Sequence, residues 1–579
     1  MAVHTRGARL RSLAVGGLVA VAVLLGMPAL ASADSASTLT VIGTSDVSDS
    51  GLMQNVIEPA FHAAYPQYTF KYIGTATGTA ITNSESGSQG ASALIVHAAS
   101  LENQFVAGGY SYNNQYGYAI WTNDFVLAGP TGDPAGVDAN ASNNIVQAFA
   151  DIASAGINGG ATPKVTFVSR GGTPGTTVEE HQIWALLATS GLAPSGLDLC
   201  VVSAADGGGD APIAPSSGVT NGAPCPGGLP SGSALPAWYA VTGLTQGPNV
   251  VAANACTGHT SGANSCYVLT DRGTYDYLTS GLDPAGSIPN LAILTRGPQS
   301  ASAPGGADAL VNYFHAYIIN PSKPGESVNL PAAQDFVNLI TSPALQAELK
   351  LYLDDTSDPA GAPFVADASP GLTETGLRAK ASAGKKVTVA GQVTNPEPGY
   401  PALAKQSVTV DELVGGLPIP VGSAKTSATG SYRIQFTPDS SGEYEVTTAQ
   451  ISQIENTSLS PAFGDILSPA ATSPVYVAVA GLPGSHALRF TKVSVRHTKL
   501  SVKATLTPAP AEAGASVKLF ALRSSGGRER QIARVRVGAN KKVFTLNAKL
   551  AHGSWVLQLE YIQKGQTSTY SGLTEIHVA

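Results

Sequence analysis

The fold of this chain is decided by "KVTFVSRGGTPGTTVEEHQIWALLATSG", Lys164–Gly191. The first part is short and apolar, which predicts a buried strand, and the last part has the length and spacing of a helix that ends at Gly191. The loop between them, Ser169–Thr177, holds glycines, hydroxyl-bearing residues and a single cation, Arg170. Because a helix N-terminus presents free backbone N–H groups and partial positive charge, this loop predicts a site for a small oxyanion.

The same order of strand, glycine-bearing loop and helix recurs from residue 38 to residue 353. "TLTVIGTS" and "YTFKYIGT" are predicted strands, and "SGLMQNVIEPAFHAAY" between them has helical spacing. This alternation predicts an α/β domain with largely parallel sheets, in which ligands bind beyond the carboxyl ends of the strands. Because the region runs to more than about 300 residues, we expect it to form two lobes.

The sequence changes in character after Leu353. Residues 354–372 have the composition of a linker, and from about residue 373 the helical period is replaced by short alternating strands with glycine and proline between them. Such spacing predicts immunoglobulin-like β-sandwiches, one over 373–480 and one over 485–579. The predicted fold class is therefore an α/β two-lobed domain over 34–353, followed by two all-β sandwiches.

The first 33 residues have the three parts of a secretory signal peptide. A basic head precedes an apolar run, Leu13–Leu25, and Ala31–Ala33 supplies small residues for cleavage. We expect the mature chain to begin near Asp34 and to be secreted, either extracellular or associated with the cell wall. The apolar run is too short to cross a bilayer, so we expect no membrane span.

Charge is unevenly distributed along the chain. Residues 485–579 hold 15 lysines and arginines against 4 acids, a net charge of +11, whereas residues 34–484 have a net charge of −21. A concentration of positive charge attracts polyanions, so we expect the basic module, above all Arg528–Lys542, to bind anionic cell-wall polymers. The alternative is that these side chains only keep a sandwich soluble.

All four cysteines lie between Cys200 and Cys266. Four cysteines allow three connectivities, and proximity along the chain favours Cys200–Cys225 and Cys256–Cys266. Export makes disulfides plausible. A zinc site is the alternative, but the spacing lacks a Cys-x-x-Cys pair, so we expect no metal and no cofactor.

Three loops that follow predicted strands are candidates for the ligand site: 43–51, 74–80 and 169–177. Each is rich in glycine and hydroxyl groups, and together they would present many hydrogen-bond donors to an anion. The alternative is that they are merely turns, in which these residues are common. The predicted ligand-binding residues are Thr44, Ser45, Asp46, Ser50, Thr75, Thr77, Arg170, Gly171, Thr173 and Thr176.

Several segments resemble a known family, the extracellular tungstate-binding proteins of ABC transporters. The resemblance rests on "SALIVHAASLENQFVAGGY", "YAIWTNDFVLAGPTGDPAGV", "VTFVSRGGTPGTT", "YVLTDRGTYDYL" and "VNYFHAYIINPSKPGESVNLPAAQDFVNLITSPALQ", in this order, and covers about residues 38–353. It implies a type II periplasmic-binding-protein-like fold, whose two lobes close on an oxyanion and deliver it to a permease driven by ATP hydrolysis.

The chain also departs from the family pattern. Asp49–Gly51 match the end of the family's first loop, but Asp46 stands where the family usually has a serine. In the third loop Ser169–Gly171 and Gly175–Thr176 match, whereas Pro174 removes both a hydroxyl and a backbone N–H.

Asp46 bears on the choice of ion. Tungstate and molybdate are fully deprotonated near pH 7 and only accept hydrogen bonds, whereas phosphate keeps a proton that a carboxylate could accept. The alternative is that Asp46 caps a helix or turn and points away from the ligand. The resemblance implies a tungstate-like or molybdate-like oxyanion; Asp46 keeps phosphate as the alternative, and an organic anion or a lost ligand is also open.

Other candidate residues have structural explanations. We expect His97 to pack at a strand end, Trp184 to lie in the core, and Asp271 and Arg272 to form a structural pair. No Gly-x-Ser-x-Gly, His-Glu-x-x-His or P-loop pattern occurs, so we expect no enzyme. The resulting prediction is a secreted solute-binding protein with an ABC permease as partner and no nucleic acid; the alternative is a cell-surface interaction protein built on the same scaffold.

Overall fold

The computed structural model describes residues 37–578, apart from 161, 260, 284–285, 324–326, 355–360, 383, 399, 457–462, 481–486, 508–513, 524–529, 539–541, 564–568 and 572–573. The predicted signal peptide lies outside the described residues. No helix among those described combines the length and the apolar character that crossing a membrane requires.

The first lobe is built on parallel strands. β1 (Thr38–Thr44) pairs in parallel with β2 (Thr69–Thr75) and β3 (Ala93–Val96), and β11 (Val311–Ile318) runs antiparallel to β3. Large aromatic side chains, such as the fully buried Phe61, fill the core between sheet and helices. The helical segments of this lobe are α2 (Asp46–Asp49), η1 (Met53–Ile57), α3 (Glu58–Ala64), α4 (Thr77–Ser86), α5 (Ala99–Ala107), α11 (Leu330–Ile340) and α12 (Pro343–Leu349).

The second lobe repeats the arrangement. β5 (Thr166–Ser169) pairs in parallel with β8 (Tyr239–Val241) and β9 (Cys266–Asp271). The helix after β5, α8 (Gly175–Ser190), ends at a left-handed Gly191, as the sequence predicts, and Trp184 on it is fully buried in the core. The other helices are α6 (Val137–Ala141), α7 (Ile145–Ile157), α9 (Gln246–Ala255) and α10 (Arg272–Ser280).

One long strand, β4 (Gly117–Pro130), joins the two lobes. It runs antiparallel to β11 in the first lobe and to β9 and β10 (Leu291–Arg296) in the second. The sheet order is β2-β1-β3-β11-β4-β9-β5-β8. The sheet is therefore mixed, and the expectation of largely parallel sheets is wrong because periodicity reveals a strand but not its direction.

Both predicted disulfides, Cys200–Cys225 and Cys256–Cys266, are present. The first closes the segment that holds the small hairpin of β6 (Asp198–Val201) and β7 (Asp210–Ile213). The second closes the turn that leads from α9 into β9.

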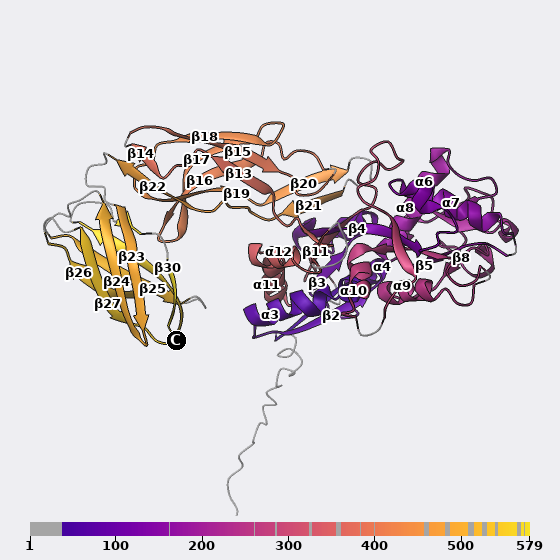
Figure 1. Cartoon of the computed structure of the whole chain (residues 1–579), viewed down its shortest axis with the longest axis horizontal. Helices are drawn as coiled ribbons and strands as arrows, with labels where there is room; N and C mark the ends of the chain where they lie inside the picture. The colour runs from indigo at the N-terminus through magenta and orange to yellow at the C-terminus, as the bar shows by residue number, and fades with distance from the viewer. Residues whose placement is uncertain are drawn as a thin grey trace, which may run out of the picture.

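The first β-sandwich is built onto the two-lobed domain. Its hairpin of β20 (Ile451–Asn456) and β21 (Phe463–Leu467) joins the larger sheet, where β21 pairs in parallel with β4, and β12 (Val365–Ala366) pairs antiparallel with β4 (Figure 1). The segment expected to be a linker thus contributes a strand to the sheet. The sandwich proper has one sheet of β13 (Gly371–Thr375), β15 (Val387–Thr394) and β18 (Ser431–Phe436), and another of β14 (Lys380–Ser382), β22 (Val475–Ala480), β19 (Gly442–Thr448), β16 (Ser407–Val414) and β17 (Leu417–Lys425).

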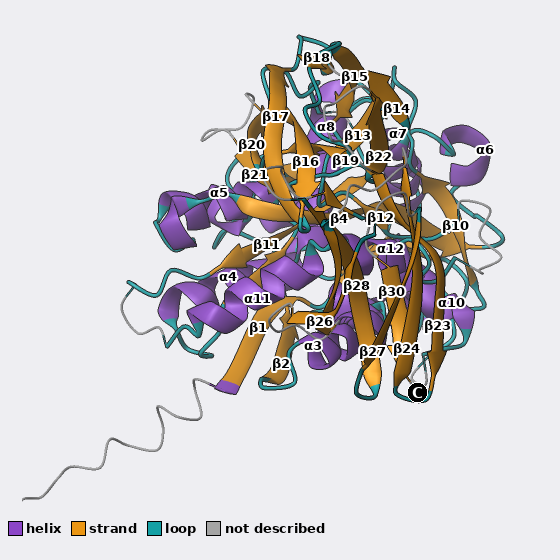
Figure 2. Cartoon of the chain, turned by 90° about the vertical axis from the view of Figure 1, so that its left-hand side faces the viewer, coloured by secondary structure: helices purple, strands orange, loops and turns teal. Residues whose placement is uncertain are grey.

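The second β-sandwich lies at the far end of the molecule from the second lobe (Figure 1), and Figure 2 views the molecule from the side of this sandwich. Inward residues of both of its sheets, including Trp555, form a separate core. One sheet has β23 (Ala487–Arg496), β24 (Lys499–Thr507) and β27 (Val543–Lys549), and the other has β26 (Arg530–Arg536), β25 (Ser516–Arg523), β28 (Gly553–Ile562), β29 (Thr569–Tyr570) and β30 (Thr574–Val578).

Candidate functional site

The three predicted loops extend from the ends of β1, β2 and β5. The first runs into α2, the second into α4 and the third into α8, so helix N-termini lie beside the loops. Gly171 and Gly172 in the third loop have φ angles of 70° and 68°. Glycine adopts such left-handed φ angles at little cost, so two glycines here allow the backbone to turn directly after Arg170.

The structure brings the three loops together between the lobes. Arg170 Nη2 donates to Ser45 Oγ at 2.9 Å, which joins the third loop to the first. The backbone N–H of Gly78 donates to the Thr173 carbonyl at 2.9 Å, and the Gly175 N–H donates to Thr77 Oγ1 at 3.1 Å. Residues that the sequence placed in one site therefore do lie side by side.

Arg170 is the buried cation at this junction, with only 3% of its surface exposed. Its Nη1 donates to Gln246 Oε1 at 2.8 Å, and Thr176 Oγ1 donates to the same oxygen at 2.9 Å. Gln246 is held in turn by its Nε2, which donates to Thr270 Oγ1 at 2.6 Å. The amide oxygen of Gln246 thus occupies the position of an acceptor between a guanidinium and a hydroxyl.

The sequence analysis missed Gln246. It is the first residue of α9, which follows β8 through another glycine-bearing loop, "VTGLTQG". The same pattern of strand, loop and helix could have identified it, but β8 has only three residues, too few to show a strand period.

Asp46 is buried and contacts His97. Its Oδ2 lies 2.7 Å from His97 Nε2, and both side chains are fully buried. Thr44 Oγ1 is 3.1 Å from the same nitrogen, and Asn312 Oδ1 is 2.6 Å from Nδ1. The ring also stacks on Phe314 with centroids 4.6 Å apart, so His97 does more than pack at a strand end.

These contacts explain the charge state of the pair. Burial acts to lower the pKa of His97, but the carboxylate of Asp46 outweighs it, so the pKa is raised. Burial acts to raise the pKa of Asp46, but His97 and then Thr44 and Arg170 outweigh it, so this pKa is lowered. The two groups therefore form an ion pair, and Asp46 is not the N-cap of α2, which is Ser45.

The remaining predicted residues are placed around this centre. Ser50 is fully buried, and its hydroxyl donates to the Val47 carbonyl at 3.2 Å. The Thr75 carbonyl accepts from the Ser45 N–H at 2.8 Å, and the Gly171 N–H donates to Ser169 Oγ at 3.2 Å. These residues shape the loops, whereas Arg170 and Thr176 present donors to the centre and Ser45 Oγ accepts from Arg170.

The expected pair of Asp271 and Arg272 does not form. Arg272 binds Asp124 and donates to the Gly361 carbonyl at 2.8 Å, so it contacts the segment that leads to the first sandwich. Asp271 caps α10 by accepting from the Thr274 N–H at 2.9 Å. Burial, with a contribution from Asp46, raises the pKa of Asp271 to about 7.

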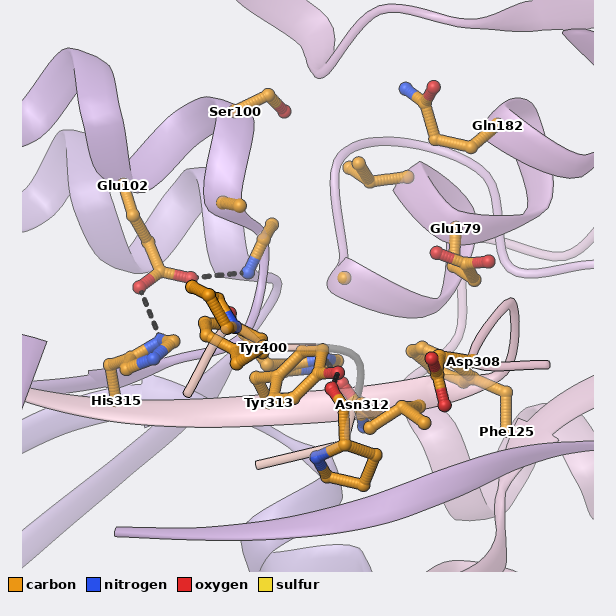
Figure 3. Close-up of a pocket in the computed structure, with 18 residues that line it drawn as sticks. Ser100, Glu102, Phe125, Glu179, Gln182, Asp308, Asn312, Tyr313, His315 and Tyr400 are labelled. Atoms are coloured by element: carbon orange, nitrogen blue, oxygen red, sulfur yellow. Dashed lines mark hydrogen bonds and ion pairs between the residues drawn. The ribbon is translucent and has the colours of Figure 1, made fainter. Parts of the chain in front are cut away.

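A cavity of about 520 Å³ adjoins the loops, and its wall includes His97 and Gly175. In Figure 3, Glu102 lies on one side of the cavity and Glu179 and Asp308 on the other. Burial raises the pKa of Glu179 to about 8. A lining with three carboxyl groups is unlike the donor set around Arg170, so the cavity is not the better place for an anion.

Comparison with known proteins agrees with this arrangement. The family model of a PBP superfamily domain matches residues 31–344, more than half of the chain. The chain belongs to the PBP superfamily. The periplasmic-binding-protein-like α/β fold expected from the sequence is thereby confirmed.

Two relatives of this PBP superfamily member have descriptive names. A protein of Haloferax volcanii named as an ABC transporter anion-binding protein is 29% identical over 318 residues, which cover 55% of this chain and 70% of that protein. The tungstate-binding protein TupA of Peptoclostridium acidaminophilum is 30% identical over 159 residues, which cover 26% of this chain and 47% of TupA.

Two solved structures are also similar to part of the chain. A tungstate ABC transporter structure from Geobacter sulfurreducens is 24% identical, covers 53% of this chain and 95% of that one, and has a TM-score of 0.35. The tungstate-binding protein TupA from Desulfovibrio alaskensis is 24% identical, covers 57% and 98%, and has a TM-score of 0.36.

Proposed function

We propose that this protein binds a small oxyanion between its two lobes and serves as the solute-binding component of an ABC uptake system. The observation that carries the proposal is the buried guanidinium of Arg170, which donates to Ser45 Oγ and shares the acceptor Gln246 Oε1 with the Thr176 hydroxyl where the three loops converge. The relatives named above are binding proteins of the same type. The chemistry proposed is binding alone, without catalysis.

The geometry supports a specific way of binding. Gln246 Oε1 accepts from both Arg170 and Thr176, and an oxyanion oxygen could replace it with the same two donors. Hydrogen bonds from a charged donor contribute about 1.5–3 kcal/mol each, more than neutral ones. Because Arg170 and Gln246 belong to the second lobe and Ser45 to the first, the bound ion would hold the lobes together.

The identity of the ion depends on the Asp46–His97 pair. With His97 protonated, the negative charge of Asp46 is offset, and Arg170 supplies a positive charge that the carboxyl groups of Asp49 and Asp271 also face. We therefore propose a tungstate-like or molybdate-like ion, and we keep phosphate as the alternative because a carboxylate could accept its proton.

Calorimetric titration with tungstate, molybdate, sulfate and phosphate tests the proposal. At least one ion should bind, and Arg170→Ala should weaken that binding by about ten- to a hundredfold, since one charge-assisted bond contributes about 1.5–3 kcal/mol. Arg433→Ala, which removes an exposed arginine from β18 in the first sandwich, is the matched control and should bind like the wild type. Equal affinity in Arg170→Ala, or no binding of any of the four ions, would refute the proposal.

We further propose that the protein is exported and that its basic sandwich contacts anionic cell-wall polymers. Arg530, Arg534 and Arg536 on β26 are exposed, although part of the predicted cluster Arg528–Lys542 lies outside the described residues. Salt screens such contacts, with a Debye length of about 3 Å at 1 M. We expect the full chain to sediment with purified cell walls at low salt and to be released at high salt. If it does not sediment at low salt, the cell-wall polymer is not a partner.

A further inference from the structure

Three acidic or imidazole side chains meet where the first sandwich joins the two-lobed domain. His315 lies on β11, Glu397 follows β15, and Asp465 lies on β21. One potential ligand atom from each residue lies within 4.8 Å of the others. The three residues are 1%, 3% and 0% exposed, so water does not solvate this cluster, which we call the inter-domain cluster.

The inter-domain cluster buries carboxyl oxygens away from water. Both carboxylate oxygens of Asp465 are buried without a hydrogen-bond partner among the residues that the structure describes, and the same holds for the neighbouring Asp367. Burying a carboxylate without a partner is costly, so this arrangement indicates a missing positive charge.

Neighbouring side chains also contact the potential ligands His315 and Glu397. Glu102 Oε2 lies 3.0 Å from His315 Nδ1, as Figure 3 shows, and Tyr317 donates to the same oxygen at 2.8 Å. Glu397 Oε2 accepts from Gln453 Nε2 at 3.0 Å. A carboxylate on one ring nitrogen of a histidine directs the other nitrogen, here Nε2, towards a metal ion, and such outer contacts are typical of metal sites.

We propose that the inter-domain cluster binds a divalent transition-metal ion such as Zn²⁺ through His315, Glu397 and Asp465. Zinc takes histidine nitrogen and carboxylate oxygen at about 2.0–2.2 Å, so binding would draw the three side chains inward. An imidazole ligand favours zinc over calcium, which prefers an all-oxygen set. Because His315 comes from one domain and Glu397 and Asp465 from the other, the ion would fix the first sandwich to the two-lobed domain beside the β21–β4 pairing.

Protons are the competing explanation. A protonated His315 beside Glu102 and Asp465, together with a protonated Asp367, would balance the charge without a metal. The two explanations differ in one observable. Only the metal site retains zinc after the free ion is removed.

The test uses the full chain, stripped with EDTA, exposed to Zn²⁺, desalted, and analysed for bound metal and melting temperature. We expect about one zinc ion per chain and a higher melting temperature, because an ion that binds only the folded state stabilises it. Asp465→Asn, which keeps the size of the side chain, should lower zinc affinity by at least about tenfold because one of three ligands is lost. The matched control is Asp439→Asn, which removes an exposed carboxylate from the same sandwich and should bind zinc normally.

Several results would overturn the proposal. Wild-type protein that retains no zinc after desalting would show that protons balance the charge. Equal zinc retention by Asp465→Asn and the wild type would place the ion elsewhere. Stabilisation by Ca²⁺ but not by Zn²⁺ would contradict the assignment to transition metals.

Discussion

The proposed oxyanion site around Arg170 and the inter-domain cluster bury charge in opposite ways. The cleft surrounds one guanidinium, Arg170, with hydroxyls and amides and pairs its own buried acid, Asp46, with His97. The inter-domain cluster gathers acids around one imidazole, His315. β11 serves both, because Asn312 bonds His97 in the cleft while His315 lies in the cluster. The comparison teaches that the sign of the buried charge, rather than burial itself, decides which ligand a site can take.

The largest effect is expected from Gly175→Ala, which would break the cleft and leave the inter-domain cluster intact. A Cβ at Gly175 would lie 2.3 Å from His97 Cε1, so either the ring or the start of α8 must move. Overpacking of this kind costs about 1–3 kcal/mol. We expect a lower free energy of unfolding in denaturant titrations and loss of oxyanion binding, with unchanged zinc retention.

The control for this substitution is Gly132→Ala, at a loop position where an added Cβ meets nothing within 4 Å. It should unfold like the wild type. Wild-type stability and oxyanion affinity in Gly175→Ala would show that the contact between α8 and His97 does not shape the cleft.

The two sites also differ in how much of them the sequence could predict. Arg170, Ser45 and Thr176 stand in loops directly after strands, so local spacing was enough to place them together. His315, Glu397 and Asp465 share no local pattern, and no spacing rule brings them together. Their meeting depends on the β20–β21 hairpin leaving the sandwich and pairing with β4.

Long-range strand pairing also limited the prediction of the fold from the sequence. Alternation predicted strands and helices and the change to all-β structure, but not strand direction or the sheet that a strand would join. The pairing of Asp46 with His97 was missed for a related reason, since the two residues follow different strands and only the folded sheet brings them to 2.7 Å.

A smaller effect, on selectivity, is expected from Asp46→Ser, which removes the acid from the cleft. A fully deprotonated ion such as tungstate is repelled by a carboxylate, whereas phosphate can donate its proton to one. We therefore expect the ratio of tungstate to phosphate affinity to rise by about tenfold, which corresponds to about 1.4 kcal/mol. Titration calorimetry with both ions measures the ratio, and Asp439→Ser on the surface should leave it unchanged. An unaltered ratio in Asp46→Ser would mean that the carboxylate does not face the ligand.

The smallest effect concerns a third way of burying acids, in which the carboxyl group keeps its proton. Burial raises the pKa of Glu179 to about 8. Burial is also the main cause that raises the pKa values of Glu180 and Asp271 to about 7. These acids ionise near pH 4 when unfolded, so between that pH and their folded pKa the folded state binds more protons and stability falls as pH rises. Burial lowers the pKa of His181 to about 4, so this histidine opposes the trend only below about pH 6.5.

Between pH 6.5 and 8.5, His97 and His315 act in the same direction as the acids, because their pKa values are raised although burial acts to lower them. The difference between the wild type and Glu179→Gln therefore isolates the carboxyl group. We expect the melting temperature of the two-lobed domain to fall by a few degrees across this pH window in scanning calorimetry, and Glu179→Gln to reduce the fall. Glu348→Gln, at an exposed position on α12, should show the wild-type slope. A melting temperature that is flat or rises over this window would mean that these carboxyl groups are already ionised at pH 6.5. Each ionised carboxylate would then need a cation to balance its charge, as we propose for Asp465. The distinction between acids that keep a proton and acids that bind a metal would no longer hold.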